Sequence, residues 1–223
     1  MTELCLYHTP GACSRVTLNA LEEAGFDYND QAINIFKGEQ YNPDYLTVNP
    51  KGKVPALKVG DTILTENPAI LMYLHQLKPE ARLLPVVNNA AEQMDIYSDL
   101  LWCSSTLHPF VRQVRMPMRF TDEDPSGIYA KGVECFSAAL LKIEERLSND
   151  KWWYGDCWSI MDVYLYWCYT TAASADFSLA PYPDILKHAA NVSERASYQR
   201  ALTRELNAIK KAGIELPGSA ILT

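Results

Sequence analysis

A cysteine and a serine near the N-terminus are the first residues whose types and position could do chemistry. Cys13 lies in a Pro-Gly loop directly before a predicted helix, and Ser14 follows it. The unpaired backbone N–H groups and the positive dipole end at a helix start stabilise a thiolate, so this position suits reactive sulfur. Ser14 is predicted to cap the helix, although its hydroxyl could instead donate a hydrogen bond to a thiolate carried by a ligand. Position alone also allows Cys13 to be a small buried side chain and Ser14 to be only a cap.

The segment Lys53-Val54-Pro55 could bind an extended peptide. Proline keeps the residue before it out of the helical conformation. The backbone N–H and C=O of Val54 are therefore predicted to be available for pairing with an incoming peptide backbone. The alternative is an ordinary strand that begins at a proline.

Glu66 and Asn67 could together bind the two charged groups of an α-amino acid. Asn67 and Pro68 are typical of a helix start, with Asn67 as the cap and Pro68 at the first helical position. The Glu66 carboxylate could bind an ammonium group, and the N–H groups of the helix start could bind a carboxylate. The alternative is an exposed glutamate in front of an ordinary capped helix.

The elements that must position these residues alternate between strands and helices in the first third of the chain. Apolar residues at helical spacing follow Cys13 and end at Gly25, which is typical of a helix C-terminus. Gly60-Asp61 separates two short apolar runs and predicts a hairpin turn. The resulting order is strand, helix, strand, and then strand, strand, helix. The predicted strands are 4–7, 28–35, 56–59 and 62–65, and the predicted helices are 16–24 and 67–76.

The remainder of the chain is predicted to be helical. Apolar residues recur at helical spacing in five segments, and Ser159 and Asp162 form a Ser-x-x-Asp capping pattern at the start of one of them. Those segments are 91–114, 129–147, 161–171, 185–192 and 198–209. The sequence thus predicts an α/β domain over residues 1–78, a Pro-containing linker over 79–89 and an all-α domain over 90–223.

The net charge argues against nucleic acid and membrane surfaces as partners. A total of 20 Lys and Arg against 27 Asp and Glu gives a net charge of −7, opposite in sign to what phosphate backbones and anionic lipids attract. Residues 1–5 lack the basic start of a signal peptide, and the apolar stretch 163–169 is too short to span a bilayer. The six cysteines and four histidines lack metal-like spacing. We therefore expect a cytoplasmic protein with reduced thiols and no metal.

Three segments together resemble the cytosolic glutathione S-transferases and are most similar to the bacterial beta-like group. They are LYHTPGACSRVTLNALEEAG, NPKGKVPALKVGDTILTENPAILMYL and WWYGDCWSIMDVYLYW, and the likeness extends to about NVSERASYQRAL. The resemblance implies a thioredoxin-like N-terminal domain and an all-helical C-terminal domain that forms much of a homodimer interface. It further implies a detoxification enzyme whose active site lies in the cleft between the domains.

The resemblance implies that glutathione binds in an extended form. Its cysteinyl backbone would pair with Val54, with Pro55 in the cis form. Its γ-glutamyl group would meet Glu66 and Asn67, although Asn67 stands where the family usually has serine. This difference preserves hydrogen bonding but changes its geometry.

Further residues are assigned by the same resemblance. Lys37 and Lys53 match positions near the glycyl carboxylate, and His108 matches a histidine near the glutathione thiol. A structural role in its helix is the alternative for His108. The electrophile would lie against the helical domain, and the residues expected on its side are His8, Arg112, Arg115 and Met116. For the two arginines, a solvated helix face is the alternative.

Three functions follow from these expectations. The first is a conjugating transferase that uses Cys13, Ser14 and the helix dipole to hold the glutathione thiolate against a small electrophile. The second is a disulfide reductase in which Cys13 carries glutathione as a mixed disulfide, a monothiol route because the chain lacks a CxxC pair. The third is a non-catalytic protein that binds glutathione or hydrophobic ligands.

Overall fold

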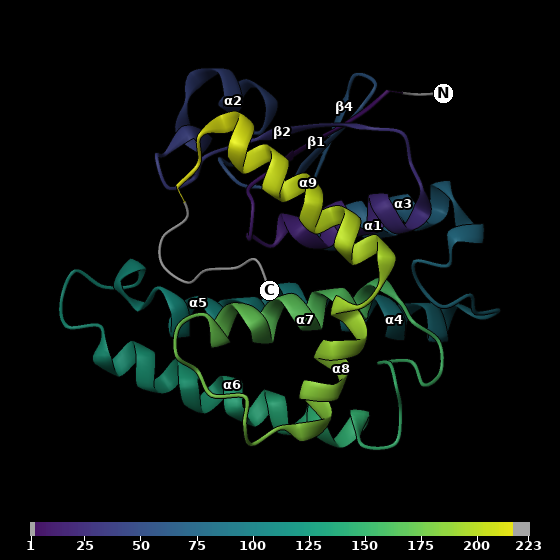
Figure 1. The fold of residues 1–223 in the computed structure, drawn as a ribbon, viewed down its shortest axis with the longest axis vertical. Coiled ribbons are helices and arrows are strands. Elements are labelled where there is room, and N and C mark those ends of the chain that lie inside the picture. Colours follow the sequence, from purple (N-terminus) through teal and green to yellow (C-terminus); the bar gives the residue numbers. More distant parts are fainter. Residues whose placement is uncertain (1–2, 216–223) are drawn as a thin grey trace. The chain divides into compact units, whose positions relative to one another are not determined.

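The computed structural model of the chain describes residues 3–215. These residues form two compact units, one made of residues 3–83 with 195–215, and the other of residues 84–194. The elements of both are labelled in Figure 1. Each unit has its own buried core.

The first unit is built on a four-stranded sheet. Its strand order is β2-β1-β3-β4, with β1 and β2 parallel and the pairs β1–β3 and β3–β4 antiparallel. Its elements within residues 3–83 are β1 (Leu4–His8), α1 (Ser14–Ala24), β2 (Asn29–Ala32), a 3₁₀ turn (Glu39–Tyr41), α2 (Pro43–Val48), β3 (Ala56–Val59), β4 (Thr62–Thr65), α3 (Asn67–Leu77) and a second 3₁₀ turn (Pro79–Ala81). A βαβ unit followed by a ββα unit is a thioredoxin-like arrangement, so the predicted topology is confirmed.

Alternation along β1 explains how this sheet is anchored. Leu4 and Leu6 are buried, and Leu6 pairs in register with the buried Leu57 of β3. Helix α1 covers the sheet with an apolar face that includes Val16, and it ends at Gly25 in the left-handed conformation, as predicted. The start of α1, which carries Cys13, is therefore held by a rigid core.

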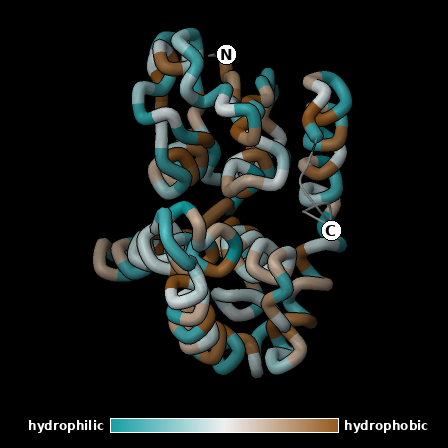
Figure 2. Tube along the Cα trace, turned by 90° about the vertical axis from the view of Figure 1, so that its left-hand side faces the viewer, coloured by the Kyte–Doolittle hydropathy of each residue, from teal (hydrophilic) through white to brown (hydrophobic). Residues whose placement is uncertain are grey.

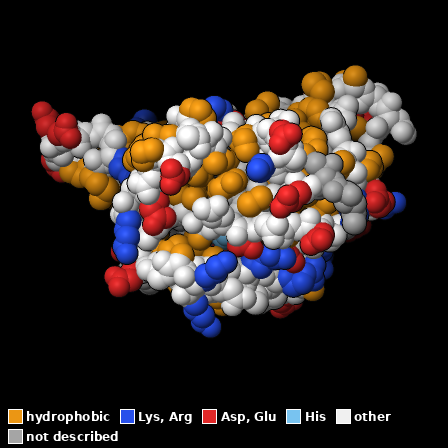
Figure 3. Space-filling model, turned by 90° about the horizontal axis from the view of Figure 1, so that it is seen from above, with side chains coloured by type: hydrophobic (Ala, Val, Ile, Leu, Met, Phe, Trp, Pro, Cys, Tyr) orange, Lys and Arg blue, Asp and Glu red, His pale blue; other side chains and the backbone are white. Residues whose placement is uncertain are grey.

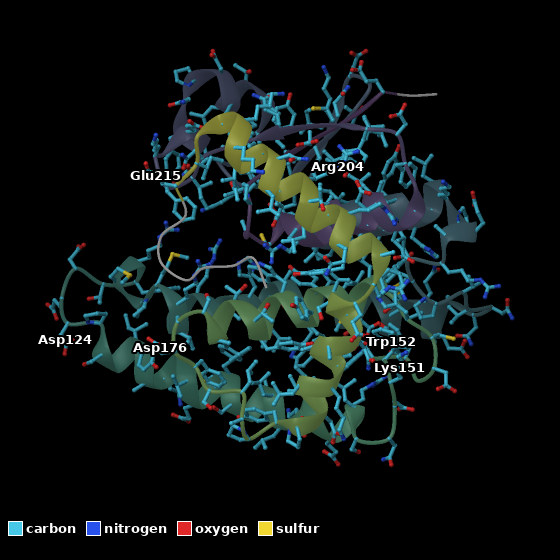
Figure 4. All side chains as sticks on the ribbon, viewed as in Figure 1. Asp124, Lys151, Trp152, Asp176, Arg204 and Glu215 are labelled. Carbon is cyan, nitrogen blue, oxygen red and sulfur yellow. The ribbon has the colours of Figure 1, made fainter. Side chains whose placement is uncertain are left out.

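The last helix, α9 (Ala196–Ala212), belongs to the first unit. It packs along α1, where Figure 1 shows the two helices side by side. Arg195 forms an ion pair with Glu23 (2.5 Å), and Arg200 forms one with Glu22 (3.1 Å). Arg204, labelled in Figure 4, also reaches Glu22. The sequence predicted a helix over 198–209 and assigned it to the helical domain of residues 90–223. The helix is present, but it packs on α1 of the first unit.

The second unit is all-helical among the described residues of its chain segment, apart from short bridged turns near residue 155. Its elements are α4 (Ala90–Trp102), a π-helical turn (Cys103–Leu107), α5 (His108–Arg115), a 3₁₀ turn (Pro117–Arg119), α6 (Ser126–Leu147), α7 (Ile160–Ala173) and α8 (Pro183–Ser193). Figure 2 shows hydrophobic and hydrophilic segments alternating along these helices, as expected for amphipathic packing.

Helix α7 is the buried centre of this unit. Twelve of its residues are buried, including Tyr164 and Tyr169. The predicted capping box is confirmed, because the Ser159 side chain accepts a bond from the backbone N–H of Met161 (3.2 Å) and Asp162 accepts one from that of Ser159 (2.8 Å). Two buried polar side chains thus fix where α7 begins.

Acidic and basic side chains lie next to one another on the face shown in Figure 3, in keeping with the ion pairs along α9.

Within residues 3–215, no helix has the length and apolar character needed to cross a membrane.

Candidate active site

The loop before α1 is held by Ser14. Its hydroxyl donates a hydrogen bond to the Thr9 carbonyl (3.1 Å) and accepts one from the Thr9 N–H (3.0 Å). Thr9 in turn donates from its side chain to the Ile33 carbonyl (2.6 Å). The residue at the cap position is Cys13, which makes no side-chain capping bond. The prediction that Ser14 caps the helix is therefore wrong, because its hydroxyl points back into the loop.

Cys13 lies beside the backbone that was predicted to bind a peptide. Its Sγ is 3.6 Å from the carbonyl oxygen of Val54, to which the thiol donates. The peptide bond between Val54 and Pro55 is cis, as the sequence resemblance implied. Two segments about 40 residues apart in sequence are thereby brought into contact, and a thiol stands at the start of a helix next to an extended backbone.

Asn67 contacts the Cys13 segment directly. Its side-chain Nδ2 donates to the Cys13 carbonyl (2.9 Å), and its Oδ1 accepts from the Thr17 hydroxyl (2.6 Å). The N-cap of α3 is Glu66, and no side chain caps this helix. The expectation of an Asn67 cap is therefore wrong, because the amide is buried and joins the starts of α1 and α3 instead.

Glu66 has a backbone conformation that is rare for a residue with a side chain. Its φ is 70° and its ψ is 123°, and non-glycine residues with positive φ concentrate where surrounding structure and function impose them. The Glu66 carboxylate is exposed and accepts from Lys51 Nζ (2.8 Å), which also bonds the Thr65 hydroxyl (3.0 Å). Sequence reasoning missed Lys51, although the run Lys51-Gly52-Lys53 offered two lysines and only the second was chosen.

The predicted glycyl-binding lysines are both exposed. Within the part of the chain that the structure describes, neither the Lys37 nor the Lys53 ammonium forms an ion pair. The Lys53 carbonyl accepts bonds from the Tyr45 hydroxyl (2.6 Å) and the Asn49 amide (2.7 Å). These bonds fix the chain directly before Val54 and leave the Lys53 side chain to solvent.

His8 lies in the core of the first unit. Its side chain is 0% exposed, and its Nε2 is 3.2 Å from Asp30 Oδ2, which joins β1 to β2. The hydrogen bond from His8, together with the charge of Arg204, lowers the pKa of Asp30. The expectation that His8 lies on the electrophile side is contradicted, because its ring is enclosed and bonded within the sheet.

The other expected ligand contacts lie in the second unit. His108 begins α5 and meets the Trp167 ring edge to face, with ring centroids 4.6 Å apart. Burial, and then the charge of Arg112, lowers the pKa of His108 to about 3, so this imidazole is neutral near pH 7. Arg112 is exposed, while Arg115 and Met116 are half-buried. Their contacts with a substrate stay predictions.

No group of three or more His, Cys, Asp or Glu side chains suited to a metal ion occurs within residues 3–215. The six cysteines are all free thiols. The groups that the structure places at the candidate site are the Cys13 thiol, the backbone of Val54 and the Glu66 carboxylate.

Comparison with known proteins places the chain in a family. The family model "Glutathione S-transferase, N-terminal domain" matches residues 2–76. The glutathione S-transferase GstA of Escherichia coli O157:H7 is 31% identical over 203 residues, covering 90% of this chain and 98% of that protein. A maleylacetoacetate isomerase of Rattus norvegicus is 31% identical over 176 residues, covering 78% and 80%.

Solved structures agree. A glutathione transferase homologue from Sulfitobacter with bound glutathione has a TM-score of 0.79 at 31% identity, covering 96% of this chain and 100% of that chain. A bacterial beta-class glutathione S-transferase from Sphingomonas chungbukensis has a TM-score of 0.78 at 28% identity, covering 90% and 98%. This protein belongs to the glutathione S-transferase family, and its neighbours include bacterial members.

Proposed function

We propose that this protein is a cytoplasmic, homodimeric transferase that binds glutathione and conjugates its thiolate to a small electrophile, with Cys13 as the catalytic residue. The observation that carries the proposal is the position of the Cys13 thiol at the start of α1, 3.6 Å from the Val54 carbonyl. A peptide paired with Val54 would carry its own cysteine side chain next to this helix start. The glutathione bound in the Sulfitobacter homologue supports the choice of ligand.

The γ-glutamyl end of glutathione fits the start of α3. The Glu66 carboxylate would accept the α-ammonium group, while the N–H groups of the first turn would donate to the α-carboxylate. The existing ion pair with Lys51 is exposed on both sides, and such pairs contribute only about 0–1 kcal/mol. An incoming ammonium group can therefore replace Lys51. Lys37 and Lys53, both solvent-exposed, are proposed for the glycyl carboxylate.

Stabilisation of the glutathione thiolate is assigned to Cys13 and the start of α1. When the peptide of glutathione takes the Val54 carbonyl as its acceptor, the Cys13 S–H can turn to donate to the thiolate. A hydrogen bond to a charged group contributes about 1.5–3 kcal/mol, and the helix dipole adds about 0.3–1 kcal/mol. Ser14 is assigned a supporting role only, because its hydroxyl proton is directed to Thr9.

The electrophile is proposed to contact the second unit. His108 is held neutral by burial, so it would offer a hydrogen bond and an aromatic surface instead of a charge. Arg112, which is exposed, could attract an anionic group on the substrate, and Arg115 and Met116 follow on the same segment.

The decisive experiment compares Cys13→Ala and Cys13→Ser with the wild-type protein in glutathione affinity and conjugation rate. If Cys13 is the donor, Cys13→Ala lowers kcat and leaves glutathione affinity close to wild type, and Cys13→Ser restores part of kcat because a hydroxyl also donates. Full conjugation by Cys13→Ala would contradict the assignment. Absence of glutathione binding by the wild-type protein would favour a non-catalytic role.

A second candidate is a monothiol disulfide reductase, favoured by the free thiol at the same helix start. The Cys13 thiolate would attack a glutathionyl disulfide, form a Cys13–glutathione disulfide and release the other thiolate. The thiolate of a second glutathione would then attack this disulfide, releasing oxidised glutathione and regenerating Cys13. Intact-mass measurement after incubation with oxidised glutathione, with peptide mapping, would show an adduct confined to Cys13. Absence of an adduct would contradict the reductase and favour the conjugating transferase.

A further inference from the structure

A buried carboxylate on the last helix reaches the loop that carries Cys13. Glu205 of α9 is 0% exposed, and its Oε1 accepts a hydrogen bond from the Gly11 N–H (3.0 Å). Its Oε2 accepts from Arg15 Nε (2.8 Å) and Nη2 (2.5 Å). Arg15 also donates from Nη1 to the Tyr198 hydroxyl (3.2 Å), which lies on α9 as well.

The two partners of Glu205 lie on either side of Cys13. Gly11 precedes Cys13 by two residues and Arg15 follows it by two, so one carboxylate holds both flanks of the thiol-bearing turn. Gly11 has a φ of 75°, a conformation that glycine adopts without strain. Residues on both sides of Cys13 are thus bonded to a helix about 190 residues further along the chain.

We propose that Glu205 is a positioning residue for Cys13, acting through its hydrogen bond to the Gly11 N–H; the inference rests on the proposed function of Cys13. Simple attachment of α9 does not require this bond. Three exposed or half-buried arginines of α9 and its start already form ion pairs with the rest of the unit. Their acidic partners are Glu22, Glu23 and Asp30, and the arginines are Arg195, Arg200 and Arg204. A buried ion pair is also weak evidence for a stabilising role, since burying both charges is costly.

The experiment must separate the Gly11 bond from the buried charges. Removing Glu205 alone would leave the Arg15 charge buried without its carboxylate and could unfold the protein. Two double variants avoid this, Arg15→Met with Glu205→Gln, and Arg15→Met with Glu205→Met. Both lack the charged pair and have similar side-chain volumes, but only glutamine retains an oxygen that can accept from Gly11.

The readout is the rate of alkylation of Cys13 by iodoacetamide at pH 7, relative to that of the exposed Cys157 in the same molecule, by peptide mass spectrometry. We expect the Glu205→Gln double variant to keep the wild-type ratio. In the Glu205→Met double variant, Cys13 turns away from the helix start, and the ratio falls about tenfold. Equal ratios in the two variants, or a higher ratio with methionine, would overturn the proposal even if their stabilities differ.

Arg200→Met is the matched control, because it removes an ion pair between α9 and Glu22 without touching residues 9–13. Its alkylation ratio should equal that of the wild type. The alkylation assay uses neither glutathione nor a conjugation substrate, so it does not depend on the transferase reaction. Failure of the proposed function would appear as absent conjugation by the wild-type protein, whereas failure of the positioning role would appear as equal ratios in the two double variants.

Discussion

The Asn67 amide donates to the Cys13 carbonyl at 2.9 Å, so the starts of α3 and α1 are joined by one side chain. Asn67 is buried, and its oxygen also accepts from the Thr17 hydroxyl (2.6 Å). Helix α3 would bind the γ-glutamyl end of glutathione and α1 its sulfur. The bond therefore sets the distance between the two ends of the proposed ligand site.

Asn67→Ala should lower the free energy of unfolding by about 2–3 kcal/mol, because it leaves the Cys13 carbonyl and the Thr17 hydroxyl without this buried partner. Urea unfolding measures the change. Asn29→Ala is the control, since among residues 3–215 the Asn29 side-chain amide makes a single long, exposed bond, to Glu3 (3.4 Å). This variant should cost less than about 0.5 kcal/mol. Equal losses in the two variants would contradict the role of Asn67.

Ser14→Ala should destabilise the protein by about 1–3 kcal/mol, since two buried bonds to the Thr9 backbone are lost. Ser14→Thr is the informative companion, because it keeps a hydroxyl but adds a methyl group at a fully buried position. A conjugation rate that follows stability in both variants would fit a supporting role. A large loss of kcat in a variant of unchanged stability would instead place Ser14 in the reaction.

Glu66→Gln should weaken glutathione binding about tenfold, because the ammonium group loses a charged acceptor. Stability should hardly change, since the Lys51 pair is exposed on both sides. Lys51→Met tests the same model, because it removes the cation that competes with the glutathione ammonium group for Glu66. This variant should bind glutathione as tightly as the wild type or more tightly. Titration calorimetry measures both. Weaker binding by Lys51→Met would show that Lys51 itself holds the ligand.

His108 should make stability sensitive to acid. Burial lowers its pKa to about 3, against about 6.5 in the unfolded chain. Between these values the unfolded chain binds the proton more strongly, so the free energy of unfolding falls as the pH drops below about 6.5. Between pH 7 and pH 4, the free energy of unfolding of His108→Gln should fall by about 3 kcal/mol less than that of the wild type. Identical pH profiles by urea unfolding would refute this.

Two glycines of α6 should respond in opposite directions to alanine. A Cβ on Gly132 would lie 2.6 Å from the Cβ of Gln113 on α5, whereas one on Gly127 would meet nothing within 4 Å. Gly132→Ala should therefore destabilise by about 1–3 kcal/mol. Gly127→Ala should stabilise by up to about 1 kcal/mol, because alanine favours the helix. Thermal unfolding of both variants measures these changes in stability. An unchanged stability of Gly132→Ala would contradict the prediction and show that α5 and α6 can move apart at no cost.

Local sequence patterns predicted the elements better than they predicted the bonds between them. The βαβ-ββα order, the hairpin at Gly60 and the Ser159 capping box depend on neighbouring residues, and all are found. Ser14 and Asn67 are common capping residues, yet Ser14 bonds to the Thr9 backbone five residues earlier, and Asn67 bonds to the Cys13 carbonyl at the start of another helix. Tertiary partners decide such cases, and a pattern of residue types does not reveal them.

The same limit applies to the helical half. The periodicity predicted one helix over 91–114, where the structure has α4, a π-helical turn at Cys103–Leu107 and α5. An extra residue in a turn leaves the apolar spacing almost unchanged, so this interruption carries little signal. Glu205 was missed for a related reason: a glutamate in an amphipathic helix is usually exposed, and only the packing of α9 along α1 encloses it.

The return of α9 to the first unit has a consequence for biosynthesis. Residues 3–83 leave the ribosome early, but the carboxylate that bonds Gly11 and Arg15 is translated only after the whole helical unit. Until then, the backbone N–H of Gly11 and the guanidinium of Arg15 are without this carboxylate as a partner. A nascent chain stalled before residue 205 would carry the loop of residues 9–13 without its bond to Glu205.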